Sequence, residues 1–543
     1  MDNVQAQGDK GVTNYTWVLV ATILASSMAF ISSSALNVAL PALQRDLGVS
    51  GAELLWIVNA YLLFLSALIL VGGSLGDHYG RKRIFTIGIL IFLVASTLCG
   101  LAMDTLFLII MRAVQGVGAA LMVPGSLAII TATFPSDKRG EAIGTWSTFS
   151  AITTVGGPLV GGFLAQEGLW RAVFFINLPL GAIALFALFA GVPETRDENI
   201  SKELDYVGAL LVTLGLAGLT FGFIQAPDFG WSDPRIVITL GGGLLMSVGF
   251  VLWEARTRHP MVPLALFKSR TFSGTNAMTL FLYAALTAVT FFLPLNLIQV
   301  QGYGEAVAGS ALLPFGLILA VMSRWAGGLV DRVGPRLPLV IGPIITGIGF
   351  VGIGLPGVTG GAGDYWTTFF PGILLMSIGM GITVAPLTTT VMGAAPQQQS
   401  GTASGINNAV SRTAGVLATA ILGAVALIVF SSALQARTAD LALSEEARTA
   451  LMEDEAPKLA EAQPPASVTA DLSGEVQSAI DRAFVETFRL LTFIGAGLAF
   501  LSALISFFFI TEPKPSDEQH HVAVQDSGCP VGHPNADTET TTA

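Results

Sequence analysis

The chain has 543 residues, of which 52% are hydrophobic and only 12% are charged, whereas an average soluble domain has about 25% charged residues. A soluble fold cannot bury this much apolar surface, so we expect a membrane protein whose backbone polar groups are satisfied inside helices or a closed barrel. The net charge of −11 comes mainly from residues 431–486, which carry eleven acidic and four basic residues. The nearly neutral remainder argues against a nucleic-acid partner.

The apolar residues gather in segments of about 20 residues, the length that a helix needs to cross a hydrocarbon core about 30 Å thick. These segments lack the alternation of apolar and polar residues that is typical of barrel strands. The sequence therefore predicts an all-α polytopic membrane protein with about fourteen transmembrane helices. They are expected to begin near residues 16, 52, 83, 105, 140, 171, 205, 236, 273, 306, 336, 366, 401 and 487.

Lys and Arg are unequally distributed between the two sets of loops. If both termini are cytoplasmic, the cytoplasmic segments carry 15 of these residues and the short loops of the opposite face carry 3. Because basic residues favour the cytoplasmic side, both termini are predicted to lie there, with the protein in the plasma or inner membrane. The acidic loop, residues 431–486, is then extracytoplasmic, either as short amphipathic helices or as a solvated insertion.

A glycine-rich motif occurs twice. The sequence GSLGDHYGR, which contains Asp77 and Arg81, recurs 254 residues later as GGLVDRVGP, which contains Asp331. Such a repeat indicates duplicated halves, and the surplus length between the copies fits two additional helices. We expect a leader (1–14), a six-helix bundle (15–192), an inserted helix pair (193–270), a second six-helix bundle (271–512) and a disordered cytoplasmic tail (513–543).

The repeated motif is suited to a protein whose helices alternate between two packing arrangements. Its glycines let two helices approach closely, and Asp77 can accept hydrogen bonds from a helix N-terminus while pairing with Arg81 one turn further on. Such a clasp favours one packing over the other. Asp77, Arg81 and Asp331 are therefore predicted to be gating residues.

With this motif the chain resembles the major facilitator superfamily, whose loop between helices 2 and 3 carries Gly-x-Leu-x-Asp-x-x-Gly-Arg-Lys/Arg. The sequences RAVQG (112–116) and GPLVGG (157–162) are similar to the family's intramembrane Arg-x-x-Gln-Gly element and its antiporter motif, although Thr153 replaces a glycine of the latter. The runs WRAVFFINLP (170–179) and LDYVG (204–208) resemble fourteen-span drug:proton antiporters of the QacA/EmrB type. The resemblance covers nearly all of residues 15–512 and implies a major facilitator fold and export of drug-like molecules.

Two elements within the predicted spans are expected to act in coupling. Arg112 carries a charge near a helix centre, where insertion costs about 2.5–3.5 kcal/mol, so it should face the protein interior or a wet cavity. The resemblance implies a role in proton coupling for Arg112, and hydrogen bonding to carbonyls is the alternative. Pro158 kinks its helix, and Gly157, Gly161 and Gly162 permit a close, bendable contact with the other half or plain helix packing.

The carboxylate expected in helix 1 is missing. The resembled exporters carry Leu-Asp-x-Thr-Ile-Val-Asn-Val-Ala-Leu-Pro there, and this chain has Ser32 in place of the Asp. Since no Asp, Glu or His falls near the middle of a predicted span, Glu53 and Glu305, near the extracytoplasmic starts of their helices, are the proton-site candidates. An uncompensated Arg112 is expected to make the cavity positive, which favours neutral or anionic substrates.

Polar and aromatic side chains within the spans are suited either to a substrate cavity or to bridges between helices. They are Asn37, Tyr61, Gln115, Asn276, Tyr283, Asn296, Gln299 and Asn407.

The protein is not expected to be an enzyme, and neither a metal site nor a cofactor is expected. Cys529 with His520, His521 and His533 is interpreted as part of a disordered tail rather than as a metal site. No phosphate-binding Gly-x-x-x-x-Gly-Lys-Ser/Thr sequence occurs, so ATP is not the predicted energy source. The glycines of residues 347–352 fit a dinucleotide fingerprint but lie in an apolar helix, where they predict close helix packing.

The sequence therefore predicts a secondary active transporter, a proton-coupled exporter of small amphipathic molecules that works by alternating access. A facilitator or symporter of a neutral or anionic solute is the alternative. A non-transporting membrane scaffold is disfavoured, because a scaffold has no need of the duplicated motif. The expected partners are a small-molecule substrate, protons and membrane lipid, and the sequence does not indicate whether a periplasmic adaptor binds.

Overall fold

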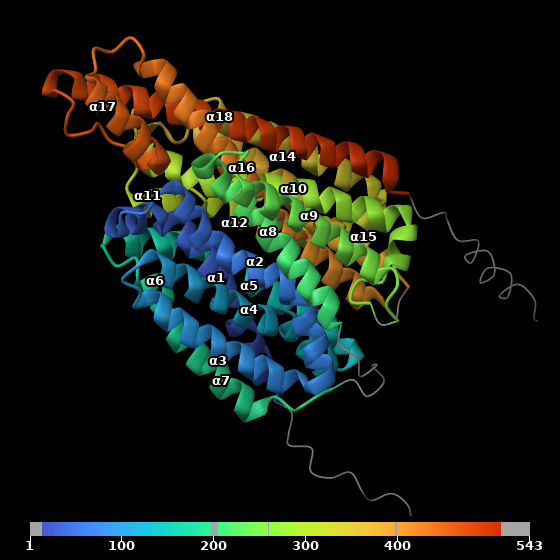
Figure 1. The fold of residues 1–543 in the computed structure, drawn as a ribbon. Coiled ribbons are helices and arrows are strands. Elements are labelled where there is room, and N and C mark those ends of the chain that lie inside the picture. Colours follow the sequence, from blue (N-terminus) through green and yellow to red (C-terminus); the bar gives the residue numbers. More distant parts are fainter. Residues whose placement is uncertain (1–13, 197–204, 259, 397–398, 512–543) are drawn as a thin grey trace, which may run out of the picture.

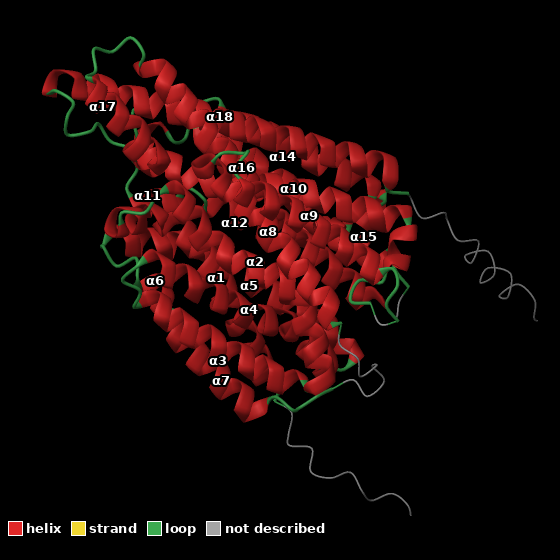
Figure 2. Cartoon of the chain, in the orientation of Figure 1, coloured by secondary structure: helices red, strands yellow, loops and turns green. Residues whose placement is uncertain are grey.

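The computed structural model describes residues 14–196, 205–258, 260–396 and 399–511, and every regular element within them is a helix (Figure 2). Thirteen helical segments in these ranges are long and apolar enough to cross a membrane. The helix α5 (Ser136–Gln166), 31 residues long, packs along the first of these segments, and we take it as the fourteenth span. The prediction of an all-α protein with about fourteen transmembrane helices is confirmed.

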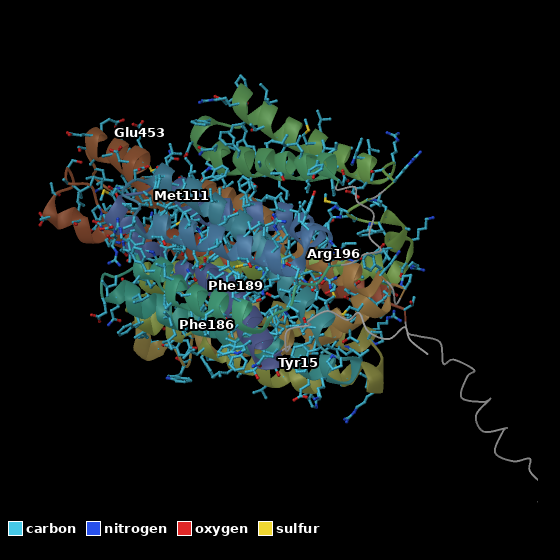
Figure 3. The ribbon with its side chains drawn as sticks, turned by 90° about the horizontal axis from the view of Figure 1, so that it is seen from below. Tyr15, Met111, Phe186, Phe189, Arg196 and Glu453 are labelled. Atoms are coloured by element: carbon cyan, nitrogen blue, oxygen red, sulfur yellow. The ribbon has the colours of Figure 1, made fainter. Side chains whose placement is uncertain are left out.

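The first bundle, here called the N half, consists of six spans (Figure 1). Its helices are α1 (Tyr15–Leu47), α2 (Gly51–Tyr79), α3 (Arg81–Gly100), α4 (Thr105–Thr133), α5 (Ser136–Gln166) and the short α6 (Ala172–Phe175), which leads into α7 (Asn177–Gly191). The exposed Phe186 and Phe189 of α7 (Figure 3) lie on the outside of the bundle, where apolar side chains meet lipid.

Two further spans follow, α8 (Tyr206–Phe229) and α9 (Pro234–Glu254). The helix α8 packs against α2 of the first bundle and against α16 of the second, and the rings of Trp56 and Phe221 lie 6.1 Å apart where α2 meets α8. The helix α9 packs mainly on α8 and is largely exposed. The inserted pair therefore lies along one side of the boundary between the two bundles.

The second bundle, the C half, repeats the arrangement of the first. Its elements are η1 (Leu264–Lys268), α10 (Arg270–Leu295) with the π turn η2 (Asn296–Val300), α11 (Glu305–Ser310) with α12 (Leu313–Gly327), α13 (Leu329–Val333), α14 (Arg336–Gly354), η3 (Ala362–Asp364), α15 (Phe369–Gly393), α16 (Ser400–Thr438) and α18 (Ala470–Phe509). The contacts α1–α5, α3–α4 and α1–α7 of the N half correspond to α10–α16, α14–α15 and α10–α18 of the C half. The two bundles therefore share one pattern of helix contacts.

An insert joins α16 to α18 at one end of the bundle, and we call that end the insert face. The insert contains α17 (Glu445–Ala450), the π turn η5 (Leu451–Glu455) and the 3-10 helix η6 (Ala456–Glu461). Glu453 lies on the part that projects from the bundle (Figure 3). The opposite end carries the repeated motif and the far end of α18 (Figure 1), and we call it the motif face.

The last helix begins at Ala470 and not near residue 487, so that predicted boundary was wrong. The reason is that the segment 470–486 is amphipathic: Val476, Ile480 and Phe484 are buried, while three of its four acidic residues are exposed. A search for continuous apolar runs does not find such a segment. The predicted loop 431–486 is therefore largely helical.

Glycine makes the closest helix contacts possible. A Cβ atom on Gly349 of α14 would stand 2.4 Å from the backbone nitrogen of Met376 in α15, and one on Gly72 of α2 would stand 2.0 Å from the carbonyl oxygen of Ala120 in α4. In lipid, helices gain little from apolar burial against each other, so close backbone approach provides much of the packing energy. The predicted packing role of the glycines at 347–352 agrees with this contact.

We expect Gly349→Ala to lower the melting temperature of the purified protein, because α14 and α15 must separate to admit the methyl group. Gly241→Ala in α9 is the matched control, since a Cβ there meets nothing within 4 Å. The measurement is thermal unfolding in detergent followed by intrinsic fluorescence. Equal melting temperatures for the two variants would contradict the packing argument.

Candidate functional site at the boundary between the halves

The N and C halves touch most closely near the insert face, where α5 meets α11. A Cβ atom on Gly162 would stand 2.3 Å from the carbonyl oxygen of Glu305, and one on Gly309 would stand 2.2 Å from the carbonyl oxygen of Pro158. Only glycine permits backbones to approach this closely. Gly162 and Pro158 therefore do contact the other half, as the sequence predicted for this motif.

The other two glycines of the motif serve a contact inside the N half. A Cβ atom on Gly157 would stand 1.9 Å from the hydroxyl oxygen of Ser34, and one on Gly161 would stand 2.1 Å from the carbonyl oxygen of Ala35. Both partners belong to α1. The motif thus lets α5 lie against α1 on one side and against α11 on the other.

Hydrogen bonds between the halves are also one-sided. The hydroxyl of Thr419 in α16 donates to the Asn59 side-chain oxygen in α2 over 2.7 Å, and the Gln44 amide donates to the Lys458 carbonyl of the insert over 3.1 Å. Among the described residues, no such bond joins the halves near the motif face. The structure is therefore closed at the insert face.

An ionic cluster covers this closed contact. The guanidinium of Arg45, at the end of α1, donates to the carboxylate of Glu305 in α11, and its Nε lies 3.6 Å from Glu461 of η6. Gln299 of η2 donates to the other oxygen of Glu461 over 3.1 Å. Gln299 therefore lies at the insert face and not deep between the halves.

Glu461 is the most buried acid of this cluster, with a side chain only 8% exposed. Burial raises the pKa of its carboxyl from 4.5 to about 7, while the charges of Arg45 and Lys458 and the hydrogen bond from Gln299 oppose the rise and Glu305 adds to it. Sequence reasoning missed this residue, because it lies in a polar segment that folds back over the bundle. Its carboxyl titrates near neutral pH in the closed form.

Glu53, the other proton-site candidate, has a structural role in the described state. Its carboxylate accepts a hydrogen bond from the backbone nitrogen of Ser50 over 2.8 Å, and the Ser50 hydroxyl accepts one from the Glu53 nitrogen. Together they form a capping box at the start of α2.

Arg112 is buried inside the N half, with 1% of its surface exposed. Its Nε donates to the Ile57 carbonyl over 3.1 Å, another guanidinium nitrogen donates to Gln115 over 2.7 Å, and the guanidinium lies 4.3 Å from the centre of the Tyr61 ring. Arg112, Gln115 and Tyr61 thus form one buried group. Since none of them is exposed to a cavity in this state, Arg112 is not the source of a positive cavity here.

A chain of hydrogen bonds connects this group to the position where the helix-1 carboxylate was expected. Gln115 donates to the Ser96 hydroxyl over 3.1 Å, and the amide nitrogen of Asn177 donates to both Ser96 and Ser32, over 3.0 and 2.9 Å. The side-chain oxygen of Asn177 is buried and has no partner. Ser32 therefore belongs to a buried polar network, and Asn177, within a motif quoted above, joins it to α7.

The C half has a small polar cavity of about 60 Å³ between α10, α15 and α16. Tyr283, Ser404, Asn407, Asn408 and Ser411 contribute to its walls. The amide of Asn407 donates to the side-chain oxygens of Asn276 and Thr279 over 3.2 and 2.8 Å. Three of the predicted cavity residues are thereby brought together.

The other predicted cavity residues are separated. Asn296 is buried in η2 beside Gln301, whose amide lies 3.4 Å from its oxygen. Asn37 of α1 is partly exposed, and its side-chain oxygen has no partner.

Arg412 is a second charge inside an apolar span, and sequence reasoning missed it. It stands twelve residues into α16, and its guanidinium lies 5.6 Å from the centre of the Phe30 ring of α1. It therefore reaches from the C half to the N half. The same reasoning that selected Arg112 could have found it.

On the motif face, Arg81 donates to the Asp77 carboxylate over 2.7 Å, which is the predicted pair. The backbone nitrogens at the start of α3 are capped by another acid: Glu194 accepts from Lys82 and Arg83 over 3.0 and 3.1 Å. The side chain of Asp331 lies outside the described residues.

Comparison with known proteins decides the family. The family model described as Major Facilitator Superfamily matches residues 22–419. The chain belongs to the Major Facilitator Superfamily. The bacterial homologue of the human lysosomal transporter Spinster, in an inward-facing conformation, has the same fold, with a TM-score of 0.65 at 18% identity over 93% of this chain and 100% of that one. A D-xylose–proton symporter also shares the fold, with a TM-score of 0.58 at 14% identity over 92% and 99% of the two chains.

Curated relatives are named for drug resistance or export. The tetracenomycin C resistance and export protein of Streptomyces glaucescens is 30% identical over 512 residues, 94% of each chain. The puromycin resistance protein pur8 of Streptomyces alboniger is 33% identical over 75% of this chain and 81% of its own. The cephamycin export protein CmcT of Amycolatopsis lactamdurans is 34% identical over 75% and 84%. This superfamily member is thus an integral membrane transporter of the drug-export group, as the sequence predicted.

We expect Gly162→Ala to open the insert face, because its methyl group would push α5 away from the carbonyl of Glu305. Double electron–electron resonance measures this opening as the distance between two spin labels. The labels are placed at the exposed positions Leu169 and Val358, one in each half. Both labels need a background with Cys99 and Cys529 replaced by Ser. The matched control is Gly156→Ala, where a Cβ meets nothing within 4 Å; equal distances in both variants would contradict the prediction.

Proposed function

We propose that the protein exports amphipathic drug-like molecules in exchange for protons, by rocking the two halves about a site between them. The observation that supports this most is the one-sided contact between the halves, held by Gly162 against Glu305 and by the ionic cluster above it. A carrier that closes one face through a detachable contact can expose its centre alternately to the two sides. A static scaffold has no use for such a contact.

We propose that the motif face is cytoplasmic and the insert face extracytoplasmic. The motif face carries basic residues such as Lys82 and Arg83, whereas the segment that forms the insert is acidic. Basic residues are retained on the cytoplasmic side of inner and plasma membranes. Both termini then lie on the cytoplasmic side of the membrane, and Glu461 lies on the extracytoplasmic side.

The antibiotics in the names of the relatives suggest the class of substrate. Tetracenomycin C, puromycin and cephamycin are named in proteins that match three quarters or more of this chain. We propose that a small antibiotic or a molecule of similar size is the cargo, and tetracenomycin C is the first probe, since that relative matches 94% of this chain.

Coupling to protons is proposed to act through the cluster at the insert face. No described Asp or Glu lies deep in the helices that border the centre, and Ser32 replaces the helix-1 acid. Glu461 and Glu305 share Arg45 at the point where the halves close. Protonation there changes the strength of the closed contact, and Asp77–Arg81 and the Arg112 network are proposed to stabilise the packings inside the N half.

The test of the function is transport into proteoliposomes with an imposed pH gradient. With acid on the insert-face side, tetracenomycin C is expected to move toward that side faster than without a gradient, and protein-free liposomes control for pH-driven partition. Arg112→Ala should abolish gradient-driven accumulation, because Gln115 and Tyr61 lose the group that holds them together. Equal transport with and without the gradient would indicate a facilitator and overturn the proposal of exchange.

The pH dependence of closure is a separate prediction. The pKa of Glu461 is about 7 in the closed form and should return toward 4.5 when the face opens to water. The closed form therefore binds the proton more tightly, so lowering the pH from about 8 to about 6 should increase the closed population. Spin-label distances between Leu169 and Val358 measure it.

Glu461→Gln is permanently neutral at this position and should remove most of the pH dependence while keeping the closed population high. Glu455→Gln, at an acid that pairs with Lys458 in the same insert, is the matched control and should retain the dependence. A full pH response in Glu461→Gln would contradict the role of Glu461.

A further inference from the structure

We propose that Arg412 binds the anionic group of the substrate, so that the transporter selects amphipathic molecules carrying a carboxylate or an acidic phenol. This inference rests on the proposed export function and names the substrate class of that same site. It depends on the position of Arg412, on its lack of an acidic partner, and on the polar and aromatic groups beside it.

Arg412 lies well inside a helix that is long and apolar enough to cross a membrane. The twelve residues that separate it from Ser400 at the start of α16 correspond to about 18 Å along a helix, in a hydrocarbon core about 30 Å thick. A charge at this depth is expensive unless it faces water or a partner. Arg412 is partly exposed, whereas Arg112 in the other half is fully enclosed by hydrogen-bond partners.

No carboxylate of the described residues neutralises Arg412. Of the described residues, none forms an ion pair with it, and the segments 400–438, 270–295 and 369–393 of the C half contain no Asp or Glu. In α1 and α2, the acids lie only toward the helix ends. The charge of Arg412 is therefore not paired with a carboxylate among the described residues, and its neighbour Ser411 borders the cavity.

The groups around Arg412 can hold the remainder of such a molecule. Asn408 lies one helical turn before it on the same face of α16, and Ser411 precedes it directly; both border the 60 Å³ cavity together with Tyr283. The Phe30 ring lies on the N-half side, 5.6 Å from the guanidinium. A guanidinium with amide and hydroxyl donors on one side and an aromatic ring on the other suits a planar aromatic anion.

Because Phe30 and Arg412 belong to different halves, a bound anion would contact both. In the form that is closed at the insert face, the guanidinium of Arg412 lies 5.6 Å from the centre of the Phe30 ring, and rocking of the halves would change this distance. Binding and release of the anion are thereby tied to the same motion that opens and closes the transporter.

Carboxyfluorescein, an aromatic anion, and rhodamine 123, a cation of similar size, are the matched probes. Fluorescence anisotropy with the purified protein measures binding, and efflux from proteoliposomes measures transport. The wild type should prefer carboxyfluorescein, Arg412→Gln should weaken its binding by about tenfold or more, and Arg412→Lys should retain part of it. Arg437→Gln, at an arginine paired with Glu486 outside the cavity, is the control and should bind like the wild type.

Thermal unfolding separates an anion site from a structural role. Removing an unpaired charge from the membrane should leave the melting temperature of Arg412→Gln unchanged or raise it, whereas loss of a structural bond would lower it. Unchanged carboxyfluorescein binding in Arg412→Gln, or a wild-type preference for rhodamine 123, would overturn the inference. Gradient-driven transport of tetracenomycin C tests the proposed function independently, since an exporter that exchanges this molecule for protons without preferring anions would still show it.

Discussion

The contact between α5 and α11 is the constraint on which the arrangement of the two halves depends. Gly162 and Gly309 remove the side chains that would keep the backbones apart, and Pro158 presents its carbonyl to the gap. When the halves separate, this contact opens to water at the insert face. Closure relies on close backbone approach together with a few polar bonds, and the groups that make these bonds can exchange them for bonds to water.

Two carboxylates, those of Glu305 and Glu461, lie where this contact ends. Glu305 supplies the carbonyl that meets Gly162 and, through its side chain, the partner of Arg45. Glu461 arrives from the insert and completes the cluster. A carboxylate in the middle of α1 would carry a large desolvation cost in the closed form, and Ser32 avoids it by joining a neutral hydrogen-bond chain to Asn177.

The fold could be predicted almost completely from the sequence, because spans of lipid-exposed helix must be long and apolar, and the repeated motif fixed the division into halves. Most helix starts agree within a few residues, and the amphipathic start of α18 is the exception. The residues of the candidate site were harder to predict from the sequence. Arg412 could have been found, since the cost of charge in lipid selects it as it selects Arg112. Glu461 could not, because only the folded insert places it against Arg45.

The two arginines inside the spans, Arg112 and Arg412, meet the cost of a charge in an apolar helix in different ways. Arg112 is surrounded by the Ile57 carbonyl, Gln115 and the Tyr61 ring, so its charge is spread over fixed dipoles of the N half. The neighbours of Arg412 are the ring of Phe30 and the neutral side chains of Asn408 and Ser411, and none of them neutralises its charge as a carboxylate would. The first arrangement stabilises one packing of helices. The guanidinium of Arg412 has no paired negative charge among the described residues, so a mobile anion can pair with it. This is the property expected of a binding group rather than a structural one.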